Sequence, residues 1–211
     1  MTIDKLRGLL WTFLLLLCSA CANVQLAGDV QSGRMFLLSE EPNRALSNFR
    51  AAAALSPNYQ VDWSLLQEGV WTYVGRCYYT LGNLPAARQA LERAVTTHPS
   101  DNMAKLYLGL VLLSSNDTAR GLKETDAGLK GLYDWLNYIT LNVRPDGQFW
   151  DPGGAIRKQI SDARALIQGP NTNVPQLISA GQAVGNRMER EMDLARQQQL
   201  QMLTEPGGGA P

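Results

Sequence analysis

Residues 68–101 carry small, aromatic and apolar residues at the spacing of a helix hairpin. A small residue at Gly75 and another at Ala87 would let two antiparallel helices approach closely, while Tyr78 and Leu91 fill the space around them. The chain therefore predicts two short helices packed face to face. The positions of this pattern are Trp71, Val74, Gly75, Tyr78, Gly82, Ala87, Leu91, Ala94 and Pro99.

The same pattern recurs on both sides, in units at about 26–59 and 102–132. Upstream, Gly33–Phe36 parallels Gly75–Tyr78, with Gly and Arg identical and an aromatic residue closing each string. The third unit is degenerate, and its second helix is expected to be the weakest of the repeat region, because Gly121 and Gly128 each weaken a helix interior by about 1 kcal/mol. Repeats of this length bury their apolar faces only by stacking, so the pattern predicts a solenoid.

Position by position, residues 68–101 resemble the tetratricopeptide repeat family, and the likeness extends over about half of the chain. The resemblance implies an all-α fold in which about three helix-hairpin repeats form a solenoid over residues 21–132. Additional C-terminal helices are expected over 133–203, followed by a flexible tail at 204–211.

The resemblance also implies a protein-binding groove lined by the first helix of each repeat. Arg34 and Arg76 would each either pair with a carboxylate of a bound partner or remain solvated. On this view, Arg76→Glu should leave folding intact and weaken partner capture. The expected partner-binding positions in the groove are Arg34, Leu37, Thr72, Arg76, Tyr79, Leu106 and Leu110.

Two features of the C-terminal part allow alternative interpretations. Phe149 and Trp150, in a loop rich in glycine and proline, could anchor a partner or pack back onto the last helix. The final helix, expected over 174–203, has an apolar stripe that includes Met188 and Met192, while Glu189 and Glu191 are assigned to its opposite, charged face. This stripe could pack on the solenoid or bind a partner helix.

The N-terminal segment has the pattern of a secretory leader. Lys5 and Arg7 precede an apolar run, 9–22, that is too short to cross a bilayer as a helix. Leu17–Cys21 resembles the lipobox of bacterial lipoproteins, which implies a signal peptide at 1–20 and lipidation of Cys21; the alternative is an ordinary cleaved leader. Ala22 resembles an outer-membrane sorting signal of Gram-negative bacteria.

Composition argues against catalysis and nucleic-acid binding. Lys plus Arg and Asp plus Glu number 19 each, so there is no basic excess to meet a phosphate backbone. The single histidine, His98, is expected at a helix end, and Cys77 is expected to be a buried apolar residue. We expect no enzyme activity, no cofactor, no metal site and no small-molecule substrate.

These observations predict an adaptor anchored by lipid to the periplasmic face of the outer membrane. It would bind other envelope proteins in the assembly of a secretion, pilus or polysaccharide-export machine, and its general architecture resembles pilotin-like tetratricopeptide lipoproteins. The alternatives are a regulator that docks a peptidoglycan enzyme and a fixed structural subunit of a large envelope complex.

Overall fold

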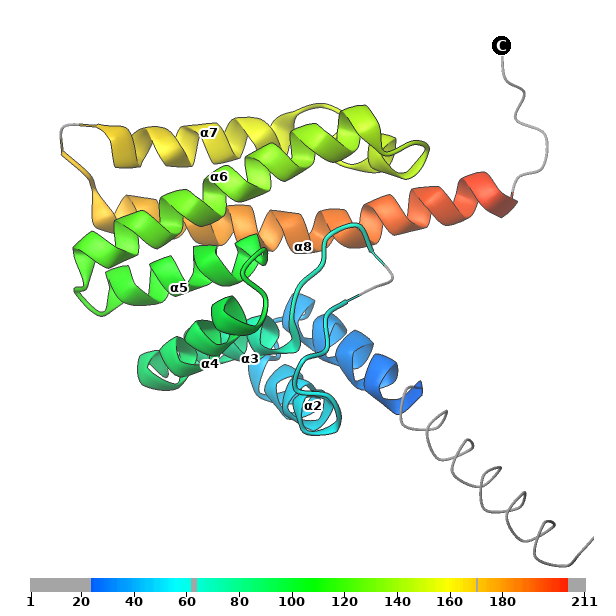
Figure 1. Cartoon of the computed structure of the whole chain (residues 1–211), viewed down its shortest axis with the longest axis horizontal. Helices are drawn as coiled ribbons and strands as arrows, with labels where there is room; N and C mark the ends of the chain where they lie inside the picture. The colour runs from blue at the N-terminus through cyan, green and yellow to red at the C-terminus, as the bar shows by residue number, and fades with distance from the viewer. Residues whose placement is uncertain (1–23, 62–63, 170, 205–211) are drawn as a thin grey trace, which may run out of the picture.

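The computed structural model describes residues 24–61, 64–169 and 171–204. These residues form helices joined by non-helical connecting segments (Figure 1). The expected signal peptide, Cys21 and residues 205–211 of the tail lie outside these ranges. The all-α prediction is confirmed for the described residues. Among them, no helix is long and apolar enough to cross a membrane.

Three consecutive helix hairpins form the first two thirds of the described chain. Helix 24–38 pairs with α2 (Pro42–Leu55), α3 (Val70–Thr80) with α4 (Leu84–Thr97), and α5 (Asn102–Ser114) with α6 (Thr118–Asn142). The helix starts follow local chemistry: the Asn83 side chain accepts a hydrogen bond from the Ala86 amide, and Asp101 accepts one from the Ala104 amide.

Small residues bring the two helices of each hairpin together, as the spacing predicts. A Cβ atom added to Gly33 would lie 2.8 Å from the Phe49 ring, and one added to Gly75 would lie 2.4 Å from Cγ of Leu91. At Gly109 the added atom would meet the backbone of Thr125 at 2.4 Å. These three glycines hold equivalent places in the hairpins, and any larger side chain there would force the helices apart.

The third hairpin differs from the sequence prediction in length. The predicted boundary at residue 132 is wrong, because α6 runs without a break from Thr118 to Asn142 and includes the aromatic segment assigned to the C-terminal extension. Gly121 and Gly128, expected to weaken this helix, lie against Leu113 and Leu106 of α5. Their cost in helix propensity is offset by close packing of α5 on α6.

A C-terminal layer follows, made of a short 3-10 helix η1 (Asp146–Phe149), α7 (Ala155–Gln168) and α8 (Val174–Thr204). The long α8 contacts α7 on one side and α5 on the other, and its end projects past the body of the molecule (Figure 1). It therefore joins the C-terminal layer to the hairpins.

Candidate functional site: the inner face and its occupant

The inner face formed by the first helices of the hairpins is the predicted binding groove, and α8 lies along it. Gly181 and Gly185 permit the contact with α5: a Cβ atom at Gly181 would lie 2.7 Å from a methyl of Leu110, and one at Gly185 would lie 2.5 Å from the Tyr107 hydroxyl. Val184, Met188 and Met192 are fully buried with α5 and α6 residues in one apolar cluster. The stripe of α8 thus packs on the protein's own hairpins, one of the two alternatives left open by the sequence.

Toward helix 24–38 and α3, the contact with α8 is ionic and centres on Glu189. Arg34 donates from Nε to Oε1 of Glu189 at 2.5 Å, and Arg76 donates from Nη1 to Oε2 at 2.5 Å. Arg34 also reaches Asp193 at 2.9 Å, and Arg76 reaches Glu68 at 2.9 Å. One carboxylate of α8 is therefore held between arginines of the first and second hairpins.

This ion network is inaccessible to water apart from its edge. Arg34, Arg76, Glu68 and Glu189 are each at most 2% exposed, whereas the Asp193 side chain is 33% exposed. Desolvation of charges at such depth is repaid only by good geometry and several hydrogen bonds. The network specifies one position of α8 along the inner face, because a shift by one turn would take Glu189 away from both buried guanidinium groups and leave Arg76 with Glu68 alone.

The protein environment shifts the pKa values of the two buried acids of the network, Glu189 and Glu68, in opposite directions. Burial alone would raise the pKa of Glu189, but Arg76 and Arg34 and their hydrogen bonds hold it below its usual value. Burial raises the pKa of Glu68 to about 8, because Arg76 offsets the desolvation only in part. Oε1 of Glu68 has no hydrogen-bond partner among the described residues. Glu68 is thus the titratable member of the network near neutral pH.

A second buried carboxylate, Asp101, connects the second and third hairpins. It accepts hydrogen bonds from the Thr72 hydroxyl at 2.6 Å and from the amides of Gly69 and Ala104, both at 2.9 Å. Burial raises the pKa of Asp101, and these donors oppose the shift. Thr72, a predicted partner-binding residue, is therefore bonded within the protein.

The prediction that the groove residues are available to a partner requires a correction. Arg34, Thr72, Arg76, Leu106 and Leu110 are all at most 2% exposed. Helix α8 packs on Leu106 and Leu110 and pairs with both arginines, and Thr72 is bonded to Asp101. Neither alternative for the arginines holds, since their carboxylates come from the same chain. Tyr79 is 9% exposed and packs edge-on against Tyr107; Leu37 is half-buried beside a small cavity that also exposes the edge of Arg76.

The expectation that Arg76→Glu leaves folding intact also changes. Such a variant would place a third carboxylate beside Glu68 and Glu189 in a buried site. If this variant failed to capture a partner, the cause would be its disrupted fold and not the loss of a binding contact.

Trp150 lies in the core, which does not agree with a role as an exposed anchor. It is 3% exposed and meets Trp135 of α6 edge-to-face, with 4.9 Å between ring centroids. Phe149 is half-buried and packs against the same apolar cluster. These aromatic residues hold η1 against α6 and α8.

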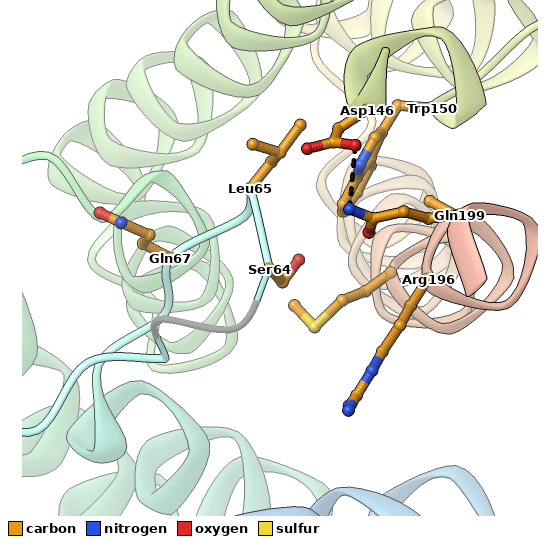
Figure 2. A pocket seen from close by; sticks show the side chains of 9 residues that line it. Ser64, Leu65, Gln67, Asp146, Trp150, Arg196 and Gln199 are labelled. Atoms are coloured by element: carbon orange, nitrogen blue, oxygen red, sulfur yellow. Dashed lines mark hydrogen bonds between the residues drawn. The ribbon is translucent and has the colours of Figure 1, made fainter. Parts of the chain in front are cut away.

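A polar cavity of about 320 Å³ opens beside Trp150, between the segment before α3 and the C-terminal half of α8 (Figure 2). Gln199 donates to Asp146 at 2.9 Å across its wall, and the other polar side chains of the lining are Ser64, Gln67 and Arg196 (Figure 2). Among the described residues, no group of three or more His, Cys, Asp or Glu side chains is arranged to hold a metal ion.

The residues missed by sequence reasoning are the acids of the network. Glu189 and Glu191 were assigned to the exposed face of α8, yet both are buried; Glu191 accepts a hydrogen bond from the Asp151 amide at 2.8 Å. A signal was present, since Gly181, Gly185 and Glu189 follow one another at intervals of four and share one helix face.

Comparison of the chain with protein-family models, with curated proteins and with solved structures found no match.

Proposed function

We propose that this protein is a non-enzymatic adaptor, anchored to the periplasmic face of the outer membrane by lipid on Cys21, that binds other proteins of the bacterial envelope. The leader pattern and the small residues before Cys21 support the anchor. Two acyl chains on this residue would hold the body at the membrane surface.

The observation that carries the binding role is the seating of α8 on the hairpins. The inner face accepts a helix through close glycine contacts and surrounds one carboxylate with two arginines. Stacked helix hairpins of this kind present long, preformed surfaces for protein segments. Because α8 fills the inner face, the resulting body is a rigid platform, and we propose that partners bind its remaining surfaces.

A fixed structural subunit is a second candidate, favoured by exposed apolar side chains where α6 and α8 end. Tyr138 and Leu141 are 61% and 74% exposed at the end of α6, and Leu200 and Leu203 are 52% and 70% exposed on the projecting end of α8. A permanent neighbour would cover the exposed apolar groups at these two helix ends.

Crosslinking of the native, membrane-attached protein, with mass spectrometry of the captured material, tests the proposal. The matched comparison is Cys21→Ala, which removes the acyl acceptor and should release the protein from the membrane fraction. We expect a small, reproducible set of envelope proteins from the wild type. Capture of no protein, together with retention of Cys21→Ala in the membrane, would reject both the adaptor role and the anchor.

A further inference from the structure

A second groove lies on the outer side of the first two hairpins, and no residue of α8 lines it. Its volume is about 690 Å³, and its lining residues come from α2, α3, α4 and the segment after α2. Helix α3 contacts both α2 and α4, an arrangement that can be followed in Figure 1. Small side chains leave this space open: Ala53 and Ala54 face it from α2, and Ala86 and Ala90 face it from α4. The buried Val74 contributes an apolar floor.

The aromatic wall of this outer groove is fixed in position. The indole of Trp71 donates from Nε1 to the Pro57 carbonyl at 2.8 Å, which ties α3 to the segment that follows α2. The guanidinium of Arg93 lies over the Trp71 ring, 3.9 Å from its centroid. Stacking occupies the face of the guanidinium and leaves its N–H edges available as donors. Arg93 is thus preorganised to donate hydrogen bonds to a carboxylate.

The two arginines that line the outer groove, Arg50 and Arg93, pair with no carboxylate of the described residues. Their neighbours on the same helices behave differently, since Arg44 pairs with Glu41 and Arg88 pairs with Glu92, at 2.8 and 2.9 Å. The lining of the groove includes no acidic side chain. The groove therefore combines an apolar floor with two uncompensated positive charges at its rim.

We propose that this outer groove binds an acidic segment of a partner protein, which inserts apolar side chains between α2 and α4 and places carboxylates on Arg50 and Arg93. The inference rests on the proposed adaptor function and names its docking surface. A lipid surface fits less well, because the apolar part is recessed between helices, whereas membrane-binding faces present apolar groups outward. Charge-assisted bidentate contacts to arginine supply the selectivity for carboxylates.

The test uses the full-length, membrane-attached protein with a photoreactive benzoylphenylalanine in place of Gln89, which lines the groove and is exposed. A second set carries the same probe at exposed positions elsewhere, such as Lys123 and Lys130 of α6. Mass spectrometry identifies the crosslinked segment of the partner. We expect an adduct at Gln89 to a peptide that has Asp or Glu next to apolar residues.

Arg50→Gln and Arg93→Gln should each weaken this adduct about tenfold, as expected for one lost charge-assisted pair. The matched control is Arg190→Gln on α8. It removes an exposed arginine that does not line the groove and is distant in sequence from the residues that do. Unchanged thermal unfolding of all three variants would show that the fold is intact. An adduct to lipid, to a segment without acidic residues, or one indifferent to both arginines would overturn the proposal. Partner capture at the α6 positions but not at Gln89 would reject the groove and leave the adaptor role standing; capture nowhere would reject the adaptor role itself.

Discussion

Arg34 and Glu189 are 155 positions apart in the chain, yet their side chains form a hydrogen-bonded ion pair at 2.5 Å in the interior of the protein. This pair joins the first hairpin to the last helix. It makes α8 a structural part of the hairpin stack, and it explains why the inner face is closed.

Removing the central carboxylate should destabilise the protein strongly. Glu189→Gln removes the one carboxylate that Arg34 and Arg76 share and leaves them with Asp193 and Glu68. Removing one partner of a buried pair typically costs about 3 to 5 kcal/mol. Urea unfolding followed by circular dichroism measures the change. Glu92→Gln, which removes the exposed pairs with Arg88 and Arg120, is the matched control and should cost under about 1 kcal/mol. Equal effects of the two substitutions would contradict the assigned role of the network.

Enlarging a glycine of α8 should loosen its contact with α5. In Gly185→Ala the new Cβ would meet the Tyr107 ring, and overpacking of this kind costs about 1 to 3 kcal/mol. Limited proteolysis should then cut α8 sooner than in the wild type. Gly28→Ala is the control, because no atom lies within 4 Å of its added Cβ, so this variant should be neutral or slightly more stable. Equal proteolysis of both variants would refute close α5–α8 packing.

The stability of the protein should fall as pH rises from about 5 to 8. The pKa of Glu68 is raised from 4.5 to about 8 in the folded state, so its contribution is complete below the lower value and lost as pH approaches the upper one. The slope is at most about 1.4 kcal/mol per pH unit. The pKa of Glu189 is lowered, so its contribution is lost only at acid pH.

Glu68→Gln isolates this effect. It cannot ionise, so its unfolding free energy should vary less between pH 5 and 8 than that of the wild type. Urea unfolding at several pH values provides the comparison, and parallel curves for the two proteins would assign the pH dependence to other groups.

Trp150 should contribute more to stability than to binding. Trp150→Ala removes a buried side chain that packs on Trp135, and such truncations cost about 3 to 5 kcal/mol. Phe149→Ala, at a half-buried position in the same loop, should cost less. Thermal unfolding compares the two. A stable Trp150→Ala variant that had lost partner capture would restore the interpretation of this residue as an exposed anchor.

Cys77 should resist alkylation in the folded protein. It is fully buried on α3, and burial raises the pKa of its thiol to about 12, so almost no thiolate forms near neutral pH. Mass spectrometry of the peptide that contains Cys77, after iodoacetamide treatment at pH 8, should show modification only when urea unfolds the protein. Rapid modification without denaturant would place Cys77 at the surface.

The helical class, the pairing of helices into hairpins and several helix ends follow from local sequence patterns. The prediction of these features succeeded because the information is local. Gly75 and Leu91 lie on two helices joined by one short turn, and Asn83 caps the second of these helices. The same local reasoning failed at residue 132, where glycines that disfavour an isolated helix are compensated by contact with α5.

The occupant of the inner face and the burial of its charges depend on long-range packing, which no local pattern reveals. Glu189 looks like a surface residue in a helix of mixed charge, and Arg34 looks like a ligand-binding residue, until α8 is placed against the hairpins. Neither charge has a partner close in sequence, so the ion pair exists only through packing between elements at opposite ends of the chain. The outer groove is likewise a product of packing, since Arg50 and Arg93 come together only when α2 and α4 flank α3.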